Sequence, residues 1–218
     1  MKKLILFFLI LFVNNLANSQ DTLKVEAVVK DTLTAQVPVA DTLLNSEEES
    51  LLPENYLFTQ RLLWGKKGLM RNFNVFELSE DSRNLEMNIR SYTVRAHQYL
   101  GYASLLSMIG AGITGQQLYK GNERNKDLHE TFAGLSNVFY FSSAAIALFQ
   151  PPVMHDRAKG FTKFRIHRVL SVIHLSSMIA TNLLSELQED NPGLKPYHKA
   201  AAITAFSSLF LATVVIKF

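Results

Sequence analysis

The chain has 218 residues, of which 48% are hydrophobic and 19% are charged, and its formal net charge is +3. It contains no cysteine, which excludes disulfides, zinc–thiolate sites, iron–sulfur clusters and covalently attached c-type haem. No block of Lys and Arg indicates a nucleic-acid interface. The averages hide a division: the chain is polar from Gln20 to Arg95, and a series of long apolar runs extends from His97 to Phe218.

Residues 1–19 have the pattern of a secretory signal peptide. Two lysines follow Met1, an apolar stretch covers residues 4–13, and small residues precede a predicted cleavage site after Ser19. The apolar stretch is shorter than the roughly 20 residues that a spanning helix needs, and an uncleaved anchor is the alternative. We therefore expect a multi-pass protein of a bacterial-type inner membrane, with its N-terminal segment exported.

Residues 20–54 are predicted to be a disordered tether. Asp-Thr-Leu recurs at residues 21–23, 31–33 and 41–43, and an acidic run follows at 47–49. Three short copies of a polar tripeptide cannot bury a core, so no repeat domain is expected.

Residues 55–96 are predicted to be an amphipathic, partly helical segment close to the membrane. Between 55 and 76, aromatic and basic residues alternate, which suits either a membrane surface or packing on the end of a helical bundle. Ser79 followed by Glu80 and Asp81 predicts a helix start, because a hydroxyl cap and early acids satisfy the free N–H groups and the helix dipole. This helix is expected to continue into the first span.

Four apolar segments, 97–118, 129–150, 166–185 and 198–217, are each long enough to cross about 30 Å of hydrocarbon at 1.5 Å per residue. They are rich in Gly, Ala and Ser, which let helices approach closely in lipid. A soluble all-helical core is the alternative, but four apolar stretches of this length with short loops argue against it. The predicted fold is all-α, with a four-helix transmembrane bundle over residues 97–218.

Histidines open all four predicted spans: His97, His129, His167 and His198. Because consecutive spans cross in opposite directions, His97 can face His167 at one side of the bundle, and His129 can face His198 at the other. A haem iron takes two axial ligands, and imidazole is a common one. The pattern predicts two bis-histidine haems b. The alternatives are a non-haem metal and histidines that only pack or form hydrogen bonds.

Two further patterns support the haem interpretation. The fourth residue after each opening histidine is small and lies on the same helix face, which leaves room for a porphyrin: Gly101, Ala133, Ser171 and Ala202. His174 has Met178 at that spacing, so it is only the alternative ligand to His167. Five cations lie within three residues of an opening histidine: Arg95, Lys126, Arg165, Arg168 and Lys199. They could pair with the anionic haem propionates. The alternative is that they are ordinary basic residues at span ends, whose long side chains reach the membrane interface.

Several local strings add to this pattern: His97-Gln98-Tyr99-Leu100-Gly101, His129 through Gly134, Gln150-Pro151, His167-Arg168-Val169-Leu170, and Asn182. With them, the region His97 to Phe218 resembles the core of the cytochrome b561 family. The resemblance implies two b-type haems, histidines paired between spans one and three and between spans two and four, and electron transfer across a membrane.

The predicted function is transmembrane electron transfer, with the chain acting as a transmembrane oxidoreductase whose donor and acceptor the sequence does not identify. The alternative is a non-redox membrane scaffold or accessory subunit that recruits a partner through its exported N-terminal segment. The expected partner is the lipid bilayer, and a homodimer is compatible with the sequence. No Ser/His/Asp triad, phosphate-binding loop or pair of carboxylates indicates another enzyme class.

Two signals disagree about orientation. A cleaved signal peptide places residues 20–96, His97 and His167 on the exported side. The positive-inside rule favours the reverse, because residues 79–96 and 151–166 hold seven Lys and Arg whereas 116–128 and 186–197 hold four. We follow the signal peptide, because its three parts agree.

Overall fold

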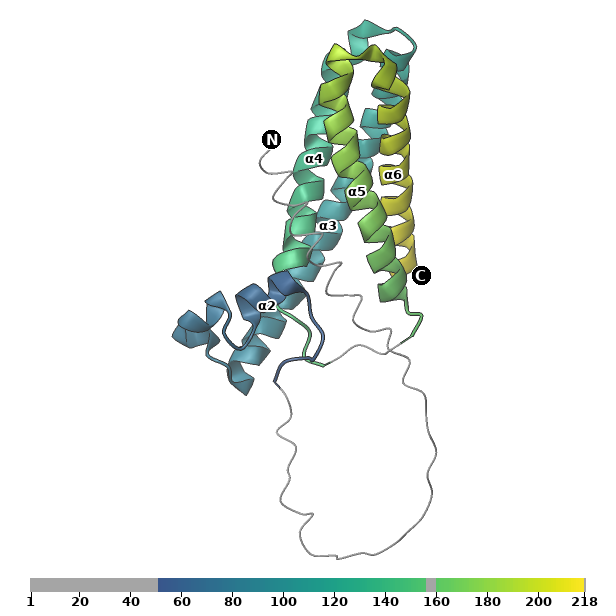
Figure 1. The fold of residues 1–218 in the computed structure, drawn as a ribbon. Helices are drawn as coiled ribbons and strands as arrows, with labels where there is room; N and C mark the ends of the chain where they lie inside the picture. Colours follow the sequence, from purple (N-terminus) through teal and green to yellow (C-terminus); the bar gives the residue numbers. More distant parts are fainter. Residues whose placement is uncertain (1–50, 156–159, 218) are drawn as a thin grey trace, which may run out of the picture. The chain divides into compact units, whose positions relative to one another are not determined.

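The computed structural model describes residues 51–155 and 160–217, which are helical and contain no strand (Figure 1). The predicted all-α class is confirmed. The predicted signal peptide and all but the last four residues of the predicted tether lie outside the described residues. The elements are α2 (Phe58–Trp64), η1 (Leu69–Asn72), η2 (Asn74–Phe76), α3 (Glu80–Tyr119), η3 (Glu123–Asn125), α4 (Lys126–Phe149), α5 (Lys163–Asp190), η4 (Pro192–Leu194) and α6 (Lys195–Lys217).

Helix α3 begins where the sequence predicts. The backbone N–H of Ser82 donates to the hydroxyl of Ser79 at 3.3 Å, which is the hydrogen bond of an N-cap. Glu80 and Asp81 occupy the first turn, where negative charge stabilises the helix dipole. At the other end the chain turns at Gly121, whose φ of 91° lies in the left-handed region that glycine adopts without strain.

The described residues form two compact units. One, called here the small unit, comprises residues 51–90 and 151–155, and the other, called the bundle unit, comprises 91–150 and 160–217. In the bundle unit, Asn137 and Asn182 exchange side-chain hydrogen bonds of 2.7 and 3.0 Å between α4 and α5. The Lys199 ammonium in α6 lies 4.6 Å from the ring centre of Tyr119 in α3. With the histidine bonds described below, these contacts join α3 to α6 into an up-and-down bundle.

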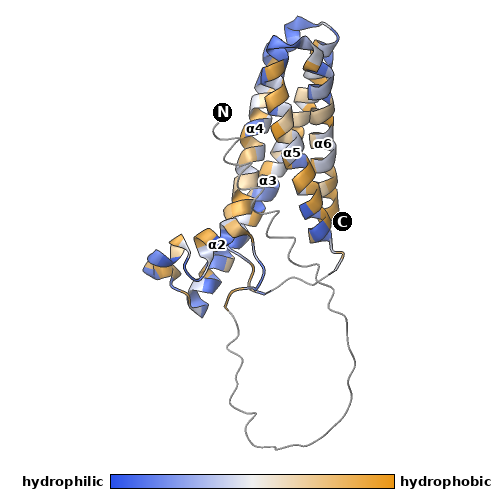
Figure 2. Cartoon of the chain, viewed as in Figure 1, coloured by the Kyte–Doolittle hydropathy of each residue, from blue (hydrophilic) through white to orange (hydrophobic). Residues whose placement is uncertain are grey.

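Three helical segments are long and apolar enough to cross a membrane: Glu123–Phe149, Lys163–Asp190 and Pro192–Lys217. Figure 2 shows how much of α4, α5 and α6 is hydrophobic. The outer surface of the bundle is largely apolar: Val138 is 62% exposed, whereas Ser136, two residues away, is 2% exposed, and the interior holds both polar and apolar side chains, among them Ile179. The predicted first span, 97–118, lies within α3, which is less apolar and is not among the three.

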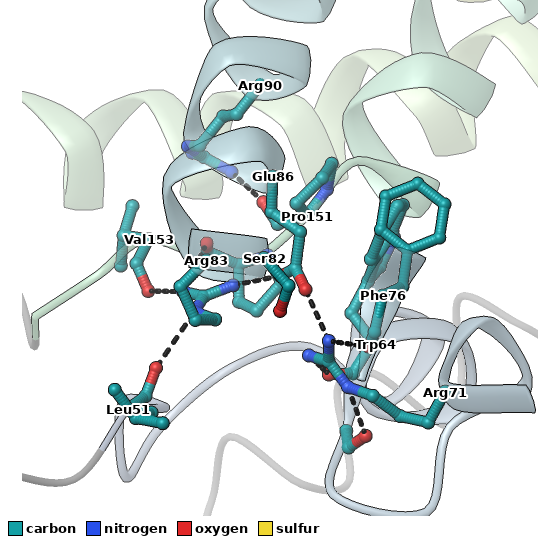
Figure 3. Close-up of polar contacts among 12 residues, drawn as sticks. Leu51, Trp64, Arg71, Phe76, Ser82, Arg83, Glu86, Arg90, Pro151 and Val153 are labelled. Atoms are coloured by element: carbon teal, nitrogen blue, oxygen red, sulfur yellow. Dashed lines mark hydrogen bonds and ion pairs between the residues drawn. The ribbon is translucent and has the colours of Figure 1, made fainter. Parts of the chain in front are cut away.

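The small unit is built around ionic side chains (Figure 3). Glu86 forms ion pairs with Arg71 and Arg83, and neither Arg83 nor Glu86 is exposed at all. Arg83 also donates to the carbonyl of Leu51 at 2.8 Å and to that of Val153 at 3.0 Å. The compact unit therefore begins before residue 55, because the last residues of the predicted tether pack into it and Leu52 is 5% exposed.

Candidate functional site

The structure brings His97 and His167 together. Their ring centres lie 6.4 Å apart, and the ring planes are nearly perpendicular at 88°. His97 belongs to α3 and His167 to α5, two helices that run in the same direction in an up-and-down bundle. His129 in α4 and His198 in α6 also lie near enough for an electrostatic interaction. All four side chains are half-buried.

All four histidines make the same hydrogen bond. Nδ1 of each lies 2.9–3.0 Å from a backbone carbonyl of the neighbouring helix; the pairs are His97 with Ser143, His129 with Ala111, His167 with Ala212, and His198 with Thr181. A carbonyl oxygen can only accept, so the proton must be on Nδ1. In the neutral imidazole Nε2 then carries the free lone pair. This is the state in which histidine coordinates a metal, with the second nitrogen oriented by a hydrogen bond.

The acceptor carbonyls reveal an internal repeat. Each of the four helices contains a histidine and, fourteen residues later, the carbonyl that accepts from the partner helix: His97 and Ala111, His129 and Ser143, His167 and Thr181, His198 and Ala212. The bonds are reciprocal within the hairpin α3–α4 and within the hairpin α5–α6. Fourteen residues of helix rise about 21 Å. Each hairpin therefore carries one histidine at each of two levels about 21 Å apart, and each histidine pair takes one residue from each hairpin.

Two features distinguish the individual histidines. The Ser143 hydroxyl lies 2.8 Å from Nδ1 of His97 and donates to the His97 carbonyl at 3.0 Å, so the Nδ1–H of His97 faces two acceptors on Ser143. His129 packs against a glycine: a Cβ placed on Gly115 would lie 2.8 Å from Cε1 and 2.9 Å from Nδ1 of its ring. Gly115 therefore provides the space that the His129 ring occupies.

His174, the alternative ligand, has a different environment. It is 9% exposed, and its Nδ1 is hydrogen-bonded to the Tyr140 hydroxyl at 2.6 Å. The two rings are also in edge-to-face contact, with centres 5.6 Å apart. His174 lacks the carbonyl bond of the four opening histidines and is held by α4 through a side chain. The geometry favours His167 over His174 as the residue paired with His97.

The other residues singled out from the sequence take varied positions. Gly101 has open space, since a Cβ there would meet nothing within 4 Å, and Ala133, Ser171 and Ala202 are half-buried. The Ser171 hydroxyl bonds back to its own helix. Four of the five cations have local contacts: Arg95 with the Tyr92 ring, Lys126 with Glu130, Arg165 with the Gly160 carbonyl, and Lys199 with the Tyr119 ring. Arg168 is exposed.

Sequence reasoning missed the acceptor carbonyls, the second acceptor on Ser143, the contact at Gly115 and the partner of Asn182, which is Asn137. A search for a residue that recurs at a fixed distance after each histidine would have found the small residues at the fourteenth position, Ala111, Ser143, Thr181 and Ala212. Among the described residues, no group of three or more His, Asp or Glu side chains could hold a metal ion. A metal site here would therefore depend on pairs of histidines.

No protein family, curated protein or solved structure matches the chain. The resemblance to the cytochrome b561 family stays a prediction, and the interpretation of the site depends on its own geometry.

Proposed function

We propose that this chain is a four-span membrane cytochrome that holds two b-type haems, one between His97 and His167 and one between His129 and His198, and transfers electrons across the membrane. The observation that carries the proposal is the hydrogen bond from Nδ1 of each histidine to a carbonyl of the neighbouring helix. A histidine that serves only packing would not need the same Nδ1–carbonyl hydrogen bond at four equivalent positions.

The spacing of the first pair fits iron. Imidazole nitrogens bind transition metals at about 2.0 Å, so two histidines that would hold one iron must have their rings within several ångströms of each other. His97 and His167 have ring centres 6.4 Å apart. Open space beside Gly101 leaves room for a porphyrin on that helix face. When bound, haem supplies reversible one-electron chemistry at iron, and the histidines and their carbonyl partners set its orientation and electronic environment.

The proposal includes α3 as the fourth span. Like the three apolar helices, this helix exposes large apolar side chains: Leu106 is 71% and Ile113 is 58% exposed, while Ser104 is fully buried. Its glycines and serines lower its hydropathy but suit close helix contacts in lipid.

We further propose that the N-terminal segment is exported and that His97 and His167 lie on the exported side. Two arginines that weigh against this orientation have structural roles in the small unit: Arg83 is buried with Glu86, and Arg90 donates to the Pro151 carbonyl. Their presence is explained by folding and needs no cytoplasmic location. Labelling of a tag fused to the N-terminus in intact cells and in spheroplasts checks this, and a cytoplasmic N-terminus contradicts it.

A visible spectrum of the purified, dithionite-reduced chain tests the main proposal. We expect b-type absorption bands and two haems per chain by pyridine haemochrome assay. The matched control replaces all four opening histidines by alanine and should purify without haem. If the unaltered chain, expressed with ample haem, shows no such bands, the electron-transfer proposal fails. The non-redox scaffold predicted as the alternative would then be favoured.

A further inference from the structure

Helix α2 exposes two apolar side chains. Phe58 is 37% and Leu62 is 48% exposed, whereas Thr59, Gln60 and Trp64 are buried. Phe58 and Leu62 are four residues apart and share one side of the helix. In a water-soluble module, neighbouring apolar residues on one side of a helix normally face the interior.

Further apolar side chains are exposed in the segment that follows α2. Three of them are Leu69 in η1, Phe73 between η1 and η2, and Val75 in η2, which are 55%, 59% and 65% exposed. The interior holds the cluster of Arg71, Arg83 and Glu86, where Arg71 also donates to the carbonyls of Trp64 and Phe76 at 2.7 Å each (Figure 3). Several large apolar side chains exposed within one short segment mark a surface that contacts a partner or a membrane.

The charges of residues 55–76 indicate which kind of surface this segment contacts. Residues 55–76 contain no Asp or Glu, and three of their four cations, Arg61, Lys66 and Lys67, are exposed. The fourth, Arg71, is neutralised by Glu86. Exposed aromatic and aliphatic side chains beside exposed cations match an interface between anionic headgroups and acyl chains. The chain also carries three helices that can cross a membrane, so the segment never leaves the vicinity of a bilayer.

We propose that residues 58–76 of the small unit dock into the interfacial layer of an anionic bilayer. Phe58, Leu62, Leu69, Phe73 and Val75 enter the acyl boundary, and Arg61, Lys66 and Lys67 pair with lipid phosphates. The buried ion cluster, together with the buried side chains of Leu52 and Trp64, holds this face in shape. The inference does not depend on haem. The sequence left two partners open for this segment, the membrane surface and the end of the bundle, and the inference assigns the membrane surface.

The experiment uses the full chain, whose lack of cysteine permits single labelled positions. Nitroxide labels are attached to Leu62→Cys and Phe73→Cys, with Asp81→Cys in the exposed first turn of α3 as the matched control. The chains are reconstituted in phosphatidylcholine vesicles with and without phosphatidylglycerol. We expect the ratio of collisions with oxygen to collisions with a water-soluble nickel complex to be several-fold higher at residues 62 and 73 than at 81. Lys66→Glu with Lys67→Glu should reduce that ratio in the anionic vesicles.

Three results would overturn the proposal. The first is that labels at residues 62 and 73 are as accessible to the nickel complex as the label at residue 81. Spin–spin broadening that disappears when labelled chain is diluted with unlabelled chain would instead identify a second copy as the partner. A ratio that stays the same after the two lysines are reversed would remove the role of anionic lipid. Unchanged helix content by circular dichroism shows that each variant is folded.

Discussion

The imidazoles of His97 and His167 meet nearly at right angles with 6.4 Å between their centres, although seventy residues separate them along the chain. Nδ1 of each ring is hydrogen-bonded to a backbone carbonyl. His97 bonds to Ser143 of α4, and His167 bonds to Ala212 of α6. The pair therefore depends on all four helices, and His129 and His198 are bonded in the same way.

Single alanine substitutions of the histidines should separate the two haems. His97→Ala should lose one haem of two, because it removes one of the two histidines of the first pair, and His129→Ala should lose the other. His155→Ala, in the exposed loop after α4, is the control and should retain both. Haem content and low-temperature spectra of the purified variants provide the measurement. Loss of the same spectral component in the His97 and His129 variants would show that the pairing is different.

Ser143→Ala should shift the midpoint potential of one haem only. The Ser143 hydroxyl gives the Nδ1–H of His97 a second acceptor, which makes the imidazole a stronger electron donor and favours oxidised iron. Its loss should raise that potential by roughly 20–60 mV, the equivalent of about 0.5–1.5 kcal/mol for one electron. Redox titration followed in the visible spectrum measures the change.

The internal repeat offers the reverse experiment. The Ala111 carbonyl accepts from Nδ1 of His129 in the same way as the Ser143 carbonyl accepts from Nδ1 of His97. Ala111→Ser should therefore lower the potential of the second haem and leave the first unchanged. Ser136→Ala is the matched control, since Ser136 is buried in α4 but bonds only within its own helix. A shift in the control as large as that of Ser143→Ala would point to a general packing effect.

Gly115→Val should displace the His129 ring. The added Cβ would lie within 3 Å of two ring atoms, and overpacking of this kind costs about 1–3 kcal/mol. We expect weaker haem retention at the His129 site, measured by haem transfer to apomyoglobin, with the other site unaffected. Gly112→Val is the control, because a Cβ at Gly112 meets nothing within 4 Å. Equal loss of haem in both variants would contradict a specific role for Gly115.

Glu86→Gln should unfold the small unit and spare the bundle unit. Glu86 is fully buried between Arg71 and Arg83, so its neutralisation leaves buried cations without a counter-charge. Removal of one partner of a buried ion pair costs about 3–5 kcal/mol. Limited proteolysis should cut within residues 51–90 much faster than in the unaltered chain, whereas Glu80→Gln at the exposed start of α3 should behave normally. Equal protection of the two variants would show that the cluster contributes little.

Local patterns in the sequence were sufficient to place the helices and to propose the histidine pairs. Ser79 predicted the start of α3, and apolar periodicity placed the other helices within a few residues of their observed ends. The proximity of His97 and His167 required only alternating helix direction, which is a property of chain order. The first span was harder to judge, because the glycines and serines that let α3 pack closely also lower its hydropathy.

The partners of those residues, by contrast, depend on contacts between distant parts of the chain. The Nδ1 acceptors are backbone carbonyls, which every residue has, so the small residues fourteen positions after each histidine can be recognised as acceptors only when the helices are packed. Arg83 entered the sequence reasoning only as one of the seven Lys and Arg that bear on orientation. It is buried because a carboxylate from the same helix and carbonyls from residues 51 and 152–153 all converge on one guanidinium, and only the folded chain brings those groups together.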